Sequence, residues 1–154
     1  MNPDKMITEL NLEIPPAPKA AGLYRPVLLQ GDLIYFSGHL PILFDGSMIT
    51  GRIGTEITIE EGVAAARHTG LSILSSVKEK LGSLNEISRL VKLLGMVNAT
   101  PDFSEHPKVI NGCSELFQEI WGEDFGVGIR SAFGVSGLPG NASVEIEGIF
   151  QLTR

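Results

Sequence analysis

Apolar residues follow a strand-like pattern in some segments of the chain and helical spacing in others. The apolar runs 24–30 and 33–37 are separated by Gly31-Asp32, a pair typical of the turn between two antiparallel strands. A third apolar run, 89–99, predicts another strand, and we interpret Gly95 within it as a β-bulge.

Two segments have helical spacing. Thr58, followed three residues later by Glu61, matches the capping box that begins a helix, and the apolar positions after it recur at helical intervals as far as Gly82. A second helix is predicted over 107–121, because a proline suits the first turn and Gly122 suits the end.

The last part of the chain predicts two strands, 130–135 and a run from Val144, joined as a hairpin by the turn Leu138-Pro139-Gly140. The complete order is β-β-α-β-α-β-β, which is typical of a single α+β domain. We expect residues 22–154 to form this domain. Residues 1–21 are expected to form an N-terminal arm, weakly helical over 1–13, and a proline-rich extended connector.

Two helices can cover only one face of such a sheet. The outward positions that we assign to the last strands include Phe133, Val135 and Phe150 as well as Glu145 and Glu147. The uncovered face is therefore partly apolar, which favours a homo-oligomer.

Composition and charge narrow the class of protein. The net charge of −6 disfavours a broad nucleic-acid or anionic-membrane surface. The single cysteine, Cys113, excludes an intrachain disulfide and a cysteine zinc cage, and it fits a reducing compartment. Residues 1–13 lack the apolar run of a secretory signal, and no segment has the length of a membrane span, so we expect a cytoplasmic protein.

Arg130 and the two acids Glu145 and Glu147 supply the strongest candidate chemistry. A guanidinium at the start of a strand can bind a carboxylate through two parallel hydrogen bonds. One of the two acids, which share a side of their strand, can accept a proton from water. The alternatives are a structural ion pair between Arg130 and Glu145 and an ordinary solvated strand face.

Further candidates lie upstream. Ser37-Gly38 follows a strand, and a glycine there allows a ligand to approach the backbone; an ordinary turn is the alternative. Tyr24 closes a pocket or packs in the core. His39 lies near these residues without a visible partner, and the three histidines lack the spacing of metal ligands, so we expect neither a metal nor a cofactor.

Together, these segments resemble the Rid superfamily (YjgF-like proteins, the reactive intermediate deaminases, also labelled endoribonuclease L-PSP-like). The resemblance runs from about Gly22 to the C-terminus, and four segments carry it: Gly22-Leu23-Tyr24, Phe36-Ser37-Gly38-His39-Leu40-Pro41, Asn111-Gly112-Cys113-Ser114-Glu115-Leu116-Phe117, and Arg130-Ser131 through Leu138-Pro139 to Glu145-Ile146-Glu147. It implies a chorismate-mutase-like fold, a homotrimer, and ligand sites in the clefts between subunits.

The resemblance also implies roles for six residues. Arg130 would bind the substrate carboxylate, and Glu145 would hold the hydrolytic water. Pocket positions are implied for Tyr24, Ser37, Gly38 and Asn111. The implied reaction is hydrolysis of a reactive enamine or imine, such as 2-aminoacrylate, to a 2-keto acid and ammonia.

The chain departs from the family pattern at three positions. Ala132 stands where the deaminases usually have cysteine, Gly137 where they have arginine before Leu-Pro, and Leu23 where proline is usual. These departures indicate a divergent subgroup. Two other hypotheses therefore stay open: a non-catalytic protein that binds a small carboxylate metabolite, and an endoribonuclease, against which the charge of −6 argues.

Overall fold

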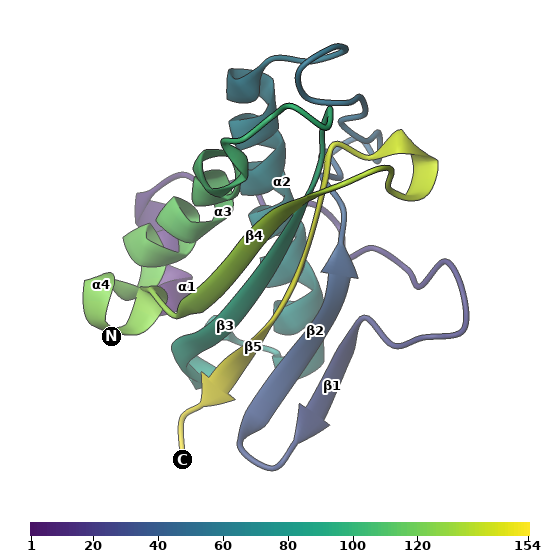
Figure 1. Ribbon diagram of the computed structural model, residues 1–154. Helices are drawn as coiled ribbons and strands as arrows, with labels where there is room; N and C mark the ends of the chain where they lie inside the picture. The colour runs from purple at the N-terminus through teal and green to yellow at the C-terminus, as the bar shows by residue number, and fades with distance from the viewer.

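One mixed five-stranded sheet is the centre of the molecule, in a computed structural model that describes residues 1–154. Its strands lie in the spatial order β1-β2-β5-β3-β4 (Figure 1). Their bounds are β1 (Val27–Gln30), β2 (Leu33–His39), β3 (Ile87–Asn98), β4 (Ile129–Val135) and β5 (Val144–Leu152). Neighbouring strands are antiparallel, except that β3 and β4 are parallel.

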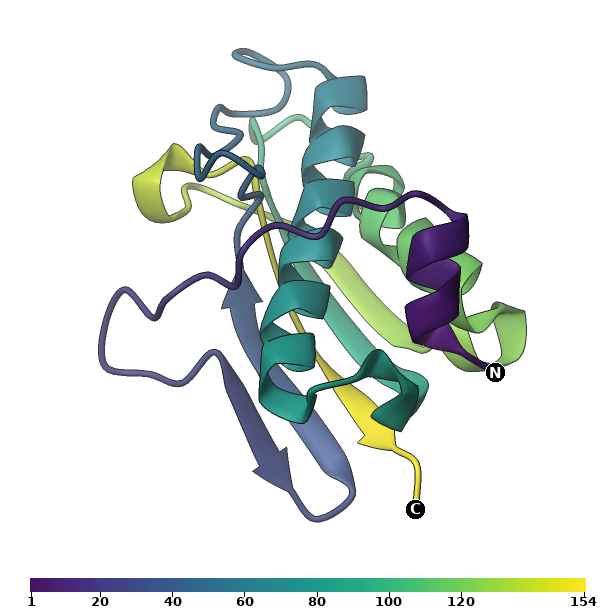
Figure 2. The same ribbon diagram turned by 180° about the vertical axis from the view of Figure 1, so that it is seen from behind.

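Two long helices cover one face of this sheet, as Figures 1 and 2 show from opposite sides. The helices are α1 (Pro3–Glu9), α2 (Ile59–Leu81), α3 (His106–Trp121) and α4 (Glu123–Gly126), with 3-10 turns η1 (Leu84–Glu86) and η2 (Pro139–Asn141). The predicted α+β fold with two helices on one face is confirmed. The short helix α1 lies within residues 1–13, where a weakly helical arm was predicted, and α4 is an addition to the predicted order.

The start and the end of α2 follow from its sequence. The Thr58 hydroxyl accepts a hydrogen bond from the Glu61 amide at 3.1 Å, and the Glu61 carboxylate accepts one from the Thr58 amide at 2.7 Å. This reciprocal pair satisfies two amides that the first turn leaves free. At the other end Gly82 has φ +84°, a left-handed conformation that stops the helix.

Aromatic packing fixes the centre of the core. Phe150 of β5 is fully buried among Phe36, Phe117 and Trp121, with ring centroids 5.1–5.4 Å away. The prediction that Phe150 points outward was therefore wrong. In β5, Val144, Ile146 and Phe150 face the helices, whereas Glu145 and Glu147 face away from them as predicted.

Close approach of α3 to its neighbours depends on small residues. A Cβ at Gly112 would overlap the carbonyl oxygen of Val63, so α2 and α3 touch backbone to backbone there. A Cβ at Gly95 would overlap Ile110 of α3, and the strand register is regular at that position. The prediction of a bulge at Gly95 was thus wrong: the glycine makes room for a helix.

We expect Gly112→Ala to lower the free energy of unfolding by about 2–3 kcal/mol, because the backbone of Val63 cannot move away as a side chain would. For a domain of this size that corresponds to a Tm about 5–10 °C lower. Thermal unfolding would measure it. The control is Gly137→Ala, where a Cβ meets no atom within 4 Å. Equal Tm values for the two variants would contradict the close helix contact.

The N-terminal arm packs on the domain. Ile7 of α1 belongs to the core, and the Asp4 carboxylate accepts hydrogen bonds from Lys78 at 2.8 Å and from Ser83. The connector then crosses α2, where the Ser75 hydroxyl donates to the carbonyl of Pro15 at 2.6 Å (Figure 2). No helix has the length and apolar character needed to cross a membrane.

The sheet face that the helices leave open carries exposed apolar side chains. Ile129 is 69% and Phe133 is 42% exposed on β4, and Leu28 and Tyr35 are exposed on the two strands at the opposite edge. Side chains of paired residues share a face, which places all four on the open side.

Candidate active site

The predicted hairpin between the last two strands is wrong, because β3 lies between β4 and β5. Arg130 pairs with Leu93, which faces the helices, whereas Glu145 pairs with Met96 on the open face. The two side chains thus lie on opposite faces, and their strands are roughly 10 Å apart. Within one subunit they form neither a common anion site nor the alternative structural ion pair.

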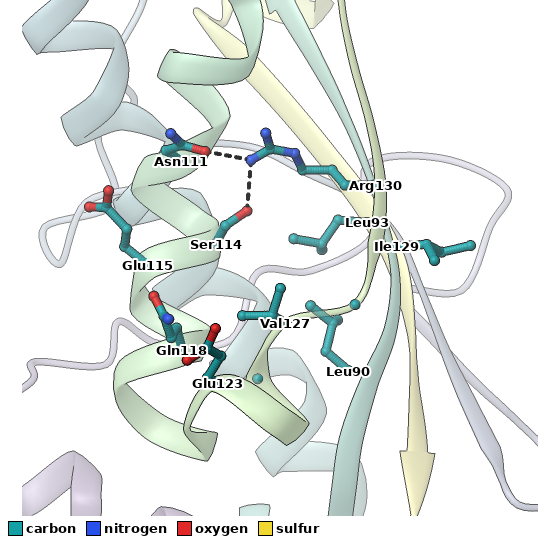
Figure 3. A pocket seen from close by; sticks show the side chains of 12 residues that line it. Leu90, Leu93, Asn111, Ser114, Glu115, Gln118, Glu123, Val127, Ile129 and Arg130 are labelled. Carbon is teal, nitrogen blue, oxygen red and sulfur yellow. Dashed lines mark hydrogen bonds between the residues drawn. The ribbon is translucent and has the colours of Figure 1, made fainter.

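Arg130 lies in a cavity of about 470 Å³ between β4 and α3 (Figure 3). One guanidinium nitrogen, Nη1, donates to the Asn111 side-chain oxygen at 2.7 Å and to the Ser114 hydroxyl at 3.0 Å. Both partners are on α3 and are three residues apart, so they share one side of the helix. The structure therefore brings together Arg130 and Asn111 of the predicted site.

These two hydrogen bonds set the direction of the Arg130 guanidinium. A guanidinium has five N–H donors, and Asn111 and Ser114 occupy only those of Nη1. No carboxylate lies within 4 Å of the side chain, which is exposed. The remaining donors are free for a planar anion, and a carboxylate is the group that they match best.

Glu145 lies in a second cavity, of about 490 Å³, together with Tyr24, Ser37 and Gly38. A Cβ at Gly38 would overlap the Glu145 carboxylate, so the absent side chain makes the space that the carboxylate occupies. Burial raises the pKa of the Glu145 carboxyl above its usual range, and the charge of Glu147 raises it further. Glu147 is exposed and outside the cavity, so Glu145 is the acid of this pocket.

Ser37 and Tyr24 shape this cavity through local hydrogen bonds. The amide and the hydroxyl of Ser37 both donate to the carbonyl of Pro26, at 2.9 and 3.3 Å. The Tyr24 hydroxyl accepts a hydrogen bond from the amide of Ala21 at 3.2 Å, and its ring is half exposed. Ser37 therefore fixes the segment that precedes β1 against the end of β2, where the strand register shifts between Phe36 and His39, and Tyr24 closes a turn within that segment.

His39 and Cys113 are not available for chemistry. His39 is 3% exposed; its ring contacts the Ser37 carbonyl at 2.6 Å and the Ser76 hydroxyl of α2 at 2.8 Å, and burial lowers the pKa of the imidazole. Its ring nitrogens therefore hold β2 to α2 instead of contacting a ligand. Cys113 is fully buried, and burial raises the pKa of its thiol far above the ordinary value, which keeps it protonated.

The two departures from the family motif have different surroundings. Ala132 shares the face of Arg130, lies opposite Gly95 and packs against the core. Gly137 lies in open space beyond β4, so nothing in the subunit fills the volume of a long side chain there. Neither position alters the contacts of Arg130 or Glu145.

The lining residues that were not among the predicted site residues include Ser114, which holds Arg130, and Lys19, which lines the Glu145 cavity. The spacing of Asn111 and Ser114 on a helix was sufficient to find the first. Lys19 comes from the connector, whose path over α2 no local pattern specifies.

Comparison with known proteins identifies the family. The model of the family described as "YjgF/chorismate_mutase-like, putative endoribonuclease" matches residues 4–145. The protein TCP17 of Trypanosoma cruzi is 36% identical over 148 residues, covering 96% of this chain and 92% of that protein.

Two crystal structures have a similar backbone. A protein of unknown function from Agrobacterium tumefaciens, Atu1372, has 36% identity and a TM-score of 0.88, covering 98% of this chain and 94% of its own. A "putative endoribonuclease" of Shewanella oneidensis has 29% identity and a TM-score of 0.93, covering 99% and 100%. The chain therefore belongs to the YjgF/chorismate mutase-like family, which confirms its resemblance to the Rid superfamily.

Proposed function

We propose that the protein is a deaminase that hydrolyses a small enamine or imine bearing a carboxylate, such as 2-aminoacrylate, to a 2-keto acid and ammonia. The observation that carries the proposal is the division of the candidate residues into two open half-sites. One presents the free donors of Arg130, and the other presents the half-buried carboxylate of Glu145.

Two half-sites on opposite faces of one sheet become a single site when one subunit supplies Arg130 and its neighbour supplies Glu145. We therefore propose a homotrimer with the ligand between subunits. Two features support it. Arg130 is on β4, an edge strand of the sheet, and the open face carries exposed apolar residues, including Ile129 and Phe133. A surface of this kind is stabilised by burial against another copy.

The reaction needs little more than positioning. After the enamine has tautomerised, the imine carbon is electrophilic, and the free donors of Arg130 hold the adjacent carboxylate. Glu145 accepts a proton from water while the water oxygen bonds to the imine carbon and the C=N electron pair moves to nitrogen, which is protonated. In the resulting carbinolamine the hydroxyl proton passes by way of Glu145 to the nitrogen, the oxygen forms the C=O bond as the C–N bond breaks, and ammonia is released from the keto acid.

The surroundings of Glu145 suit a general base. A base is most effective when its pKa lies near the working pH, and both burial and Glu147 raise the pKa of Glu145 in that direction. The net charge of −6 and the absence of a basic stripe favour this small-molecule reaction over cleavage of RNA.

The first test measures keto acid release from freshly generated 2-aminoacrylate, with and without the wild-type protein. We expect release faster than the spontaneous rate. Mixed oligomers then test the two-subunit site. Arg130→Ala and Glu145→Gln chains, each inactive alone, should recover about a quarter of wild-type activity when unfolded and reassembled together in equal amounts, because a random trimer restores a quarter of its sites.

Failure has two forms that differ in meaning. No recovery in mixed oligomers, with active wild type, would show that each site lies within one subunit. No release by the wild type would overturn the deaminase proposal. Stabilisation of the inactive wild type by small carboxylic acids would then favour the metabolite-binding alternative, which the departures at Ala132 and Gly137 motivate.

A further inference from the structure

We propose that Lys19 binds a second acidic group at the far end of the substrate, so that the preferred substrate is a dicarboxylic imine. The inference depends on the proposed deaminase function for the position of the reacting carbon. It concerns a residue of the N-terminal connector, outside the motifs that carry the family resemblance.

Two charged residues, Lys19 and Glu145, line the Glu145 cavity at the end of β2. Its lining comprises Pro18, Lys19, Ala21, Gly22, Tyr24, Pro26, Ser37, Gly38, His39, Leu40, Ile42, Pro139 and Glu145. Among these, Lys19 is the one cation, because burial favours the neutral form of His39. The cavity therefore offers one acid for chemistry and one ammonium for an anion.

Lys19 has no partner of its own. The ion pairs of the structure join Lys5 to Glu9, Arg67 to Glu119, Lys78 to Asp4 and Arg154 to Asp32, and no carboxylate lies within 4 Å of Lys19. The two charges line one cavity without neutralising each other, so the ammonium can pair with a ligand.

The connector holds Lys19 between two fixed points. On its N-terminal side the Pro15 carbonyl is bound to Ser75 of α2 at 2.6 Å, and Pro18 restricts the backbone directly before the lysine. On its C-terminal side the Pro26 carbonyl accepts hydrogen bonds from the amide and the hydroxyl of Ser37 on β2, at 2.9 and 3.3 Å. An anchored backbone reduces the entropy lost when the side chain engages an anion.

The size of the cavity exceeds what the smallest imino acids need. Its volume of about 490 Å³ is in the range of sites that hold considerably larger molecules. The α-carboxylate is assigned to Arg130 of the neighbouring subunit, and Glu145 holds the water at the imine carbon. The rest of the substrate chain therefore extends toward the connector. There, Lys19 is the charged group that can bind a terminal carboxylate.

The test compares imines of equal chain length, 2-iminoglutarate and 2-iminopentanoate, generated by oxidation of glutamate and norvaline. We expect the wild type to prefer the dicarboxylic imine in kcat/KM by about tenfold, the effect of one hydrogen-bonded charge pair. Lys19→Met should remove this preference through KM and leave turnover of the monocarboxylic imine unchanged. Lys19→Arg should retain most of it. Lys80→Met, at an exposed lysine on α2, is the matched control.

Kinetic and binding readouts distinguish failure of this inference from failure of the deaminase proposal. Equal turnover of both imines, unaffected by Lys19→Met, overturns the role of Lys19 and leaves deamination standing. Calorimetry with 2-oxoglutarate and 2-oxopentanoate gives a second measurement without turnover. Tighter binding of the dicarboxylate that is lost in Lys19→Met, in a protein without imine turnover, overturns deamination and supports the Lys19 site.

Discussion

Arg130→Ala should lower kcat/KM for imine hydrolysis by about 100-fold or more, as expected for loss of a positioned charged donor. Asn111 and Ser114 hold one nitrogen of the guanidinium and leave the donors of its other two nitrogens free (Figure 3). In the proposed mechanism, alanine removes the bidentate contact with the substrate carboxylate and leaves the imine carbon unaligned with the water. The measurement is steady-state keto acid release by purified, correctly assembled protein.

Substitutions of the same type separate this effect from a general change of charge. Arg67→Ala removes an arginine that pairs with Glu119 at 2.8 Å between α2 and α3, away from both cavities, and should retain activity. Arg130→Lys keeps the charge without the planar fork and should give an intermediate rate. Full turnover by Arg130→Ala would remove Arg130 from the mechanism.

Glu145→Gln should lower kcat by about 100-fold or more, the usual contribution of a positioned general base. The amide has the same shape as the carboxylate, so it fills the space beside Gly38, but it cannot take a proton from water. Glu147→Gln is the matched control, because Glu147 is two residues away on the same face of β5 and is outside the cavity. Equal rates in the two variants would contradict the assignment of Glu145.

The pH dependence adds a second readout for the same pair of variants. Catalysis requires the carboxylate, so activity should fall as the pH decreases through the raised pKa of Glu145. Glu147→Gln removes one cause of the raised pKa and should move this acidic limb to lower pH. Because the pKa of Glu145 is raised in the folded state, ionisation of Glu145 costs stability as the pH rises through this folded-state pKa. Above that pKa, Glu145→Gln should therefore not lower Tm.

The local patterns of the sequence predicted the elements well and the order of strands less well. A capping box and a helical stripe involve residues close in sequence, and the helix beginning after Thr58 was confirmed. The hairpin of β4 and β5 was wrong because strand neighbours are chosen by packing across the whole sheet. A strand, a helix and a strand in succession also fit a parallel crossover, which is the arrangement of β3, α3 and β4.

The sequence predicted residues that line the two cavities, but it did not predict how those residues are arranged. Arg130, Asn111, Glu145, Ser37 and Gly38 all line one of the two cavities. Their division between opposite faces depends on the register of β3 with both neighbours, which no residue near Arg130 or Glu145 encodes.

The path of the connector has a consequence for how relatives of this protein diverge. Residues 18–26 supply much of one wall of the Glu145 cavity, although they belong to neither the sheet nor the two long helices. Substitutions in residues 18–26 leave the packed core unchanged. They can therefore change which molecules bind in the cavity without lowering the stability of the fold. Exchanging residues 18–26 between homologues is therefore a way to change the substrate range while the sheet and the two long helices stay the same.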